Sequence, residues 1–168
     1  LNVYPTTSVN ENITFTTWKG ETKTLPKSAS LEMWMESPNA ENAKGYGMGL
    51  IDVDNVTLGE FNSNSPRYLK DSDGKMLYDV IFFGTWDCNG DCGVGGDLSP
   101  QSRDSVREYI SKGKGVLLGH DTIIASHPNM ASLQSDMNIV VHNGEIAMEN
   151  MGAVEVELVR KGNLTNYP

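Results

Sequence analysis

Cysteine and positive charge are both scarce in this sequence of 168 residues. It has two cysteines, and its 13 Lys and Arg face 22 Asp and Glu, which gives a net charge of −9. A surface with this excess of carboxylates repels a phosphate backbone, so we expect no nucleic acid partner. A single core at this length buries roughly 70% of the unfolded surface, and the fold therefore needs no disulfide framework or structural metal.

Long apolar runs and targeting signals are missing as well. The longest apolar stretches, Val80–Phe83 and Val116–Leu118, fall far short of the roughly 20 residues that a membrane helix needs. The first residues have neither a basic nor an apolar signal region, and the sequence opens at Leu1 instead of Met. We therefore expect no membrane insertion, and a single domain over residues 1–168 that is a module of a longer chain.

The cysteines and the glycosylation sequons bear on the compartment. Cys88 and Cys92 lie four residues apart, a spacing that suits either a small disulfide loop or two free thiols. Sequons occur at Asn12, Asn55 and Asn163, against about two expected by chance from the composition. Together with the acidic charge, these features favour an extracellular or cell-surface glycoprotein.

The N-terminal third predicts short and mainly antiparallel elements. A strand is expected at Leu1–Pro5, and Ile13–Trp18 and Thr22–Leu25 alternate as a hairpin does. A short helix should follow, capped by Ser28 or Ser30 and ending before Pro38. Its expected inner face consists of Leu31, Trp34 and Met35. Two further extended pieces are expected at Gly49–Val53 and Val56–Leu58, followed by a turn or short helix over residues 60–69.

The middle of the chain predicts a parallel β-α-β unit. The run Tyr78–Gly84 is typical of a strand buried on both faces of a sheet. A helix should then begin at Ser99 and Pro100 and end at Gly113, before a second buried strand at Gly115–Gly119. A helix over residues 130–137 and strands at 139–142 and 154–159 complete the prediction. The fold class is α/β, a mainly parallel sheet flanked by helices, with an N-terminal antiparallel hairpin.

Polar residues follow both of the clear strands. Trp86 and Asp87 follow the first, and His120 and Asp121 follow the second. Ligands of open parallel sheets bind beyond the carboxyl ends of the strands, so these four residues are the candidate ligand-binding set. His120, Asp121 and Asp87 are the catalytic candidates, as a general base with carboxylate partners. Structural roles stay open for each of them, and Asp97 is interpreted as a helix N-terminal residue.

One segment of the loop after the first strand resembles a calcium ligand set. Asp87, Asn89 and Asp91 alternate as the first ligands of an EF-hand loop do. The expected element before them is a strand instead of a helix, so an ordinary Asn-Gly turn is the alternative. Calcium is the candidate cofactor, and no other is expected.

The segment from Leu77 to Thr122 resembles a known family. Its buried strand at Tyr78–Gly84, acidic loop, amphipathic helix and second strand ending in Gly119-His120 are similar to class I glutamine-amidotransferase-like domains, especially the trehalose-utilisation (ThuA-like) branch. The resemblance implies a flavodoxin-like sheet. The same segment also looks like modules of large secreted or surface proteins.

The sequence departs from that family at the catalytic position. Amidotransferases need a nucleophilic Cys at a sharp turn after a strand, whereas here the strand at Gly115–Gly119 is followed by His120, Asp121 and Thr122. The ThuA-like branch lacks this Cys too, so sugar binding or carbohydrate chemistry stays open. We expect a non-catalytic extracellular module, structural or adhesive, whose partners are glycans, other domains or copies of the same surface assembly. The alternative is a carbohydrate-active or metal-assisted enzyme that uses His120 with Asp87 or Asp121.

Overall fold

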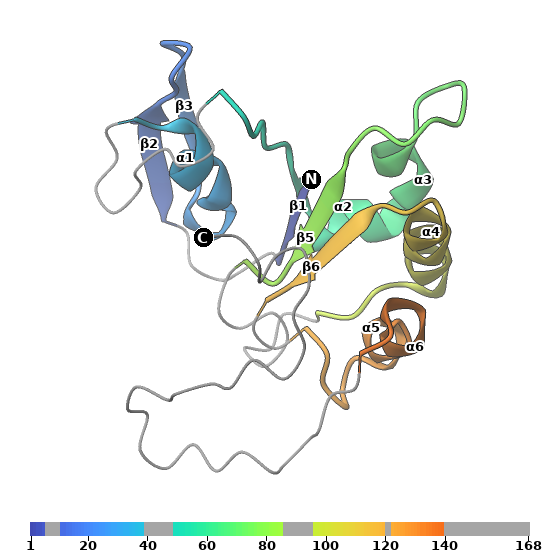
Figure 1. The fold of residues 1–168 in the computed structure, drawn as a ribbon. Helices are drawn as coiled ribbons and strands as arrows, with labels where there is room; N and C mark the ends of the chain where they lie inside the picture. Colours follow the sequence, from blue (N-terminus) through green and yellow to red (C-terminus); the bar gives the residue numbers. More distant parts are fainter. Residues whose placement is uncertain (6–10, 39–48, 86–95, 120–121, 140–168) are drawn as a thin grey trace, which may run out of the picture.

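The computed structural model describes residues 1–5, 11–38, 49–85, 96–119 and 122–139. These residues form a four-stranded parallel sheet with helices beside it and a separate two-stranded antiparallel hairpin (Figure 1). The predicted α/β class, with its mainly parallel sheet and N-terminal hairpin, is confirmed.

The parallel sheet contains β1 (Asn2–Tyr4), β4 (Asn55–Thr57), β5 (Val80–Phe83) and β6 (Gly115–Leu118). Their order across the sheet is β4-β1-β5-β6, and every neighbouring pair is parallel. Counted in chain order, this is 2-1-3-4, which matches the first four strands of the flavodoxin-like order. The direction of winding therefore reverses between β1 and β5, two central strands of the sheet.

The hairpin and a short helix form a unit on one side of this sheet (Figure 1). Strands β2 (Asn12–Thr16) and β3 (Thr22–Pro26) pair in antiparallel fashion, as predicted. They lead through the 3-10 turn Lys27–Ala29 into α1 (Leu31–Glu36). Ser30 occupies the N-cap position of α1 but makes no side-chain cap hydrogen bond.

The predicted inner face of α1 is partly wrong. Leu31 is buried as expected, but Trp34 is 40% exposed, and Glu32 and Glu36 are buried in its place. Helix α1 buries these two carboxylates because Lys23 and the segment leading into β4 supply their hydrogen-bond partners.

The opposite side of the sheet is covered by helices (Figure 1). Their bounds are α2 (Leu58–Ser63), α3 (Ser65–Leu69), α4 (Pro100–Ser111), α5 (Pro128–Ala131) and α6 (Gln134–Met137). Helix α4 begins as predicted, with the Ser99 side chain accepting a hydrogen bond from the backbone of Ser102 and Pro100 at the first position. It ends before Gly113, whose φ of +75° is the left-handed conformation that glycine tolerates. The single helix expected over 130–137 is two short helices instead.

The hydrophobic core lies between the sheet and these helices. Ile81 and Phe83 of β5 are 0% and 1% exposed and point into it, and the Phe83 ring packs edge-on against Phe61, with 5.8 Å between the ring centroids. The other buried members of this cluster are Val3, Val56, Leu58, Leu69, Leu98, Val106, Tyr109, Ile123, Met130 and Leu133.

Three sequence predictions about strands are corrected. The strand expected to be buried at Gly115–Gly119 is β6, whose residues are all exposed or half-buried, with Leu117 53% exposed. Strand β5 is not buried on both faces, because its alternate residue Val80 is 43% exposed on the side away from the helices. Residues Gly49–Val53 form no strand, since Asn55–Thr57 takes the position beside β1. The expected strand at 154–159, nearly all of the one at 139–142, and residues 39–48 after α1 lie outside the described residues. Within the described ranges, no helix has both the length and the hydropathy needed to cross a membrane.

Candidate functional site

The carboxyl ends of β5 and β6 lie side by side, as the sequence predicts. Phe83 is in register with Leu118, and the backbone nitrogen of Gly119 donates to the carbonyl oxygen of Phe83 at 2.8 Å. A Cβ on Gly119 would lie 1.9 Å from the carbonyl oxygen of Gly84, so the two backbones approach more closely than any other residue at position 119 allows. The chain therefore leaves both strands from adjacent points on one edge of the sheet.

The residues predicted to meet at this edge follow directly on these strand ends. Trp86, Asp87, His120 and Asp121 all lie outside the described residues, as do the calcium candidates Asn89 and Asp91 and the cysteines Cys88 and Cys92. Their roles as ligand-binding, catalytic, metal and disulfide residues stay predictions. Within the described ranges, no group of three or more His, Cys, Asp or Glu is placed to hold a metal ion.

Asp97 is the described carboxylate of the long loop at this edge, and it has a structural role. Its two carboxylate oxygens accept hydrogen bonds from the backbone nitrogens of Asn129 and Met130, at 3.1 and 2.8 Å, and from the Asn129 amide at 2.9 Å. These nitrogens belong to the first turn of α5, so Asp97 caps that helix. The sequence predicts a helix N-terminal role for Asp97, but at α4, whose N-cap Ser99 follows two residues later.

The segment after β6 is likewise held by local hydrogen bonds. The Thr122 hydroxyl donates to the carbonyl oxygen of Gly119 at 2.9 Å, and Nδ1 of His127 lies 3.2 Å from the carbonyl oxygen of Thr122. Both side chains are buried, with 2% and 3% of their surface exposed. These contacts fix the ends of the segment that carries His120 and Asp121 in the sequence.

A buried polar network crosses the other face of the sheet, beneath α1. The Thr85 hydroxyl donates to Oδ1 of Asn2 at 2.9 Å, and Nδ2 of Asn2 donates to Oδ1 of Asn55 at 2.8 Å. The Asn55 amide in turn donates to Glu32, which also pairs with Lys23. Asn2 is fully buried, so these bonds supply the partners that its amide would otherwise lack.

The two glutamates at the end of this network are nearly enclosed. Their side chains are 6% exposed. Burial raises the pKa of Glu32 above its ordinary value, while the hydrogen bond from Lys23 opposes that shift. The same hydrogen bond raises the pKa of Lys23. Glu36 accepts from the backbone nitrogen of Val53 at 3.0 Å and lies 3.4 Å from the Lys23 amine. The network therefore ties the hairpin and α1 to the start of β4.

This network was not predicted from the sequence. Glu32 and Glu36 are spaced i, i+4 on a helix, which is also the pattern of an ordinary solvated face, so their burial has no local signal. The capping box at the start of α2 was also not predicted, although its sequence pattern is local. Thr57-x-x-Glu60 matches the capping-box pattern, and the structure shows both of its reciprocal hydrogen bonds at the start of α2.

Two of the three sequons are described, and they differ in setting. Asn12 is exposed at the start of β2. Asn55 is half-buried in β4, and the nitrogen that a glycan would modify donates to Glu32. A glycan there would break the network, whereas one on Asn12 would project into solvent. Asn163 lies outside the described residues.

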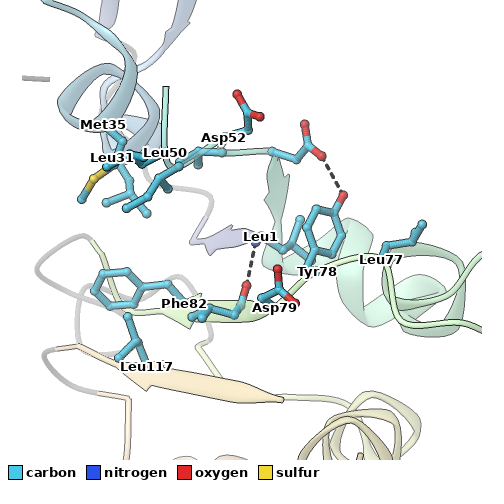
Figure 2. A pocket seen from close by; sticks show the side chains of 14 residues that line it. Leu1, Leu31, Met35, Leu50, Asp52, Leu77, Tyr78, Asp79, Phe82 and Leu117 are labelled. Carbon is cyan, nitrogen blue, oxygen red and sulfur yellow. Dashed lines mark hydrogen bonds between the residues drawn. The ribbon is translucent and has the colours of Figure 1, made fainter. Parts of the chain in front are cut away.

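A cavity of about 620 Å³ lies at the opposite, amino-terminal edge of the sheet. Figure 2 shows it between an upper layer, with Leu31, Met35 and Leu50, and a lower layer, with Phe82 and Leu117. Val80 and the residues just before three strands complete its wall; those residues are Leu1, Ile51, Asp52, Val53, Asp54, Leu77, Tyr78 and Asp79. Its volume is within the roughly 300–1,000 Å³ typical of ligand sites. No sequence pattern had pointed to this edge.

One hydrogen bond fixes part of the rim of this cavity. The Tyr78 hydroxyl donates to the Asp54 carboxylate at 2.9 Å (Figure 2). Burial, followed by this contact with Asp54, raises the pKa of Tyr78 to about 12. Tyr78 therefore stays protonated at neutral pH and acts there as a donor.

Comparisons with known proteins give this chain no relatives. No family model, no curated protein and no solved structure matches it.

Proposed function

We propose that this chain is a non-catalytic structural or adhesive module of a secreted or cell-surface protein. One observation carries the proposal: the described polar side chains at the carboxyl edge of the sheet are engaged in holding the fold. Asp97 caps α5, Thr85 bonds to Asn2, and Thr122 bonds to the carbonyl of Gly119. A general base or nucleophile must instead face a substrate at hydrogen-bond distance.

The sequence supports the same proposal. The resemblance to amidotransferase-like domains comes without the nucleophilic Cys, and the acidic charge and the sequons suit a secreted protein. In this role the carboxyl edge binds glycans or a neighbouring domain of the same assembly, through Trp86, Asp87, His120 and Asp121. Calcium is the candidate cofactor at this edge, with Asp87, Asn89 and Asp91 as its ligands.

An enzymatic function is the second candidate, because β5 and β6 deliver their carboxyl ends side by side. In this alternative His120 acts as a general base or metal ligand, and Asp87 or Asp121 is its partner. The close approach of Gly84 and Gly119 supports it, since the residues that follow both strands start from adjacent backbone positions.

The mass of the native protein, recovered from its source, tests the location on which the proposal depends. We expect a glycan on Asn12 and none on Asn55, because the Asn55 amide is engaged with Glu32. The measurement is the intact mass and the peptide map, before and after enzymatic deglycosylation and thiol alkylation. A chain without glycans, with Cys88 and Cys92 both open to alkylation, would contradict the secreted setting.

Turnover assays with the full chain separate the two candidates. His120→Ala and Asp121→Asn should lower the melting temperature without abolishing any reaction on a panel of glycosides and sugar esters. Circular dichroism confirms that each variant is folded, and Lys75→Ala, at an exposed turn, is the control. A substrate whose turnover disappears in folded His120→Ala would overturn the non-catalytic proposal.

A further inference from the structure

The cavity at the amino edge of the sheet exposes apolar surface. Leu50 is 87% exposed, Leu117 53% and Val80 43%, and all three line it. Folded domains seldom leave contiguous apolar surface uncovered, because covering it removes apolar area from water. An apolar group that covers these side chains would therefore stabilise the protein.

The rim of the cavity adds a requirement for positive charge. Asp52, Asp54 and Asp79 line it, and its lining contains no Lys, Arg or His side chain. The amino group of Leu1 also lies in the lining, where it donates to the carbonyl oxygen of Val80 at 2.8 Å, and burial lowers its pKa to about 6. Lys19 and Lys114 pair with Asp52 and Asp79 from outside, but these two carboxylates are 77% and 96% exposed, and such pairs contribute little.

Asp54 differs from the other two carboxylates of the rim. It accepts a hydrogen bond from Tyr78 and takes part in none of the ion pairs among the described residues. An occupant with a cation next to its apolar side chains would complement this rim.

Residues 154–161 have this combination. Val154, Val156 and Leu158 alternate with glutamates, so in an extended conformation they share one face. Arg160 and Lys161 follow directly, and they are the one pair of adjacent basic residues in the 168. The segment lies outside the described residues.

We propose that residues 154–161 of the same chain cover this cavity, with the apolar face of the segment against its walls and the basic pair at its acidic rim. The chain between Ile139 and Val154 is long enough, since 15 residues span up to about 50 Å. A second copy is a poorer occupant, because a two-fold interface would set this acidic rim against itself in a chain of net charge −9. The contact concerns the edge opposite to the proposed binding edge, and it holds whether or not the module is catalytic.

Zero-length cross-linking of the full chain tests the contact directly. A carbodiimide joins an amine to a carboxylate only where the two touch, so we expect a Lys161 cross-link to Asp52, Asp54 or Asp79 in the monomer. The pairs Lys19–Asp52 and Lys114–Asp79, at 3.1 and 2.6 Å, are internal controls. Control cross-links without a Lys161 product would overturn the proposal. A Lys161 product confined to dimers would also overturn it and would indicate a second copy.

Hydrogen exchange in two neighbouring variants tests the apolar face. Leu158→Asp places a charge on the face that we assign to the cavity, and Val159→Asp places the same charge on the other face. We expect backbone amides of residues 50–54 to exchange about tenfold faster in Leu158→Asp and at the wild-type rate in Val159→Asp. Amides of β5 report whether either variant has unfolded globally. Equal effects in the two variants, or no effect in either, would overturn the proposal.

Discussion

The two faces of the sheet are built by different physical means. On the helix-covered face, Val3, Ile81 and Phe83 are at most 1% exposed and pack against apolar residues of α2 and α4. On the other face, Asn2 of β1 donates to Asn55 of β4, and Asn55 donates in turn to Glu32 of α1. Next to this network the face opens into the apolar cavity. One face is thus held by area removed from water, and the other by specific pairs of polar groups.

This difference explains how each face tolerates change. Apolar packing is non-directional, so truncating a core side chain lowers the stability of the protein in proportion to the volume removed. A buried polar network depends on each partner, because removing one member leaves another donor or acceptor unsatisfied at about 1–3 kcal/mol. The second face therefore fixes which segments lie over the sheet, namely α1 and the residues before β4.

Adjacent residues of β5 give the largest expected contrast between the faces. Ile81→Ala should lower the free energy of unfolding by about 2–5 kcal/mol, because Ile81 is fully buried among the helices. Val80→Ala, one residue earlier and 43% exposed on the cavity side, should cost about 1 kcal/mol or less. Urea denaturation of both variants measures the difference. Equal costs would mean that the cavity side is packed as closely as the helix side.

The carboxyl edge gives the next contrast, between two glycines. Gly119→Ala should cost about 1–3 kcal/mol or more, because its Cβ would lie 1.9 Å from the backbone oxygen of Gly84 and force β5 and β6 apart. Gly59→Ala in α2 meets no atom within 4 Å and should stabilise the protein by up to about 1 kcal/mol through helix propensity. Thermal unfolding of the two variants should therefore shift in opposite directions. A neutral Gly119→Ala would show that the strand ends have room to separate.

Two aspartates compare the opposite edges of the sheet. Asp97→Asn should cost about 1–2 kcal/mol, since it weakens three hydrogen bonds to the first turn of α5. Asp52→Asn should change stability by less than about 0.5 kcal/mol, because its pair with Lys19 is exposed to solvent. Chemical denaturation distinguishes these values. A large cost at Asp52 would indicate that the amino edge makes contacts beyond the ion pair with Lys19.

The helix-covered face could be predicted from the sequence to a large extent, because its signals are local. Ser99 and Pro100 predict the start of α4, and Gly113 predicts its end. The apolar runs predict β5 and β6. The helical crossover between them then makes β5 and β6 parallel neighbours. These features lie within a few residues of the elements that they determine.

The second face could not be predicted in this way, because its partners are far apart in the chain. Asn2 and Asn55 are 53 residues apart, and Asn55 meets Glu32 across 23. A strand is expected at Gly49–Val53, but Asn55–Thr57 has the matching register with β1. For the candidate site, the convergence of two strand ends follows from the parallel order, whereas the roles of His120 and Asp121 depend on side-chain placement that periodicity does not encode.

Two buried or hydrogen-bonded glutamates, Glu32 and Glu60, should make stability depend on pH in opposite directions. Burial raises the pKa of Glu32 above 4.5, so the folded protein holds this proton more tightly than the unfolded chain does. Its contribution is therefore most favourable below that pH and declines as the pH rises through the folded pKa. Hydrogen bonds from the Thr57 side chain and backbone lower the pKa of Glu60. The contribution of Glu60 is full above 4.5 and is lost as the pH falls through its lower folded pKa.

The two glutamine variants should therefore show opposite trends. With rising pH across 4.5, the stability of the wild type relative to Glu32→Gln should fall, and its stability relative to Glu60→Gln should rise. Urea denaturation at a series of pH values measures both differences, and each variant serves as the control for the other because the net charge changes equally. A rising trend for Glu32 would mean that the Lys23 ion pair outweighs burial, and the second face would then be stabilised by charge pairing as well as by its amide network.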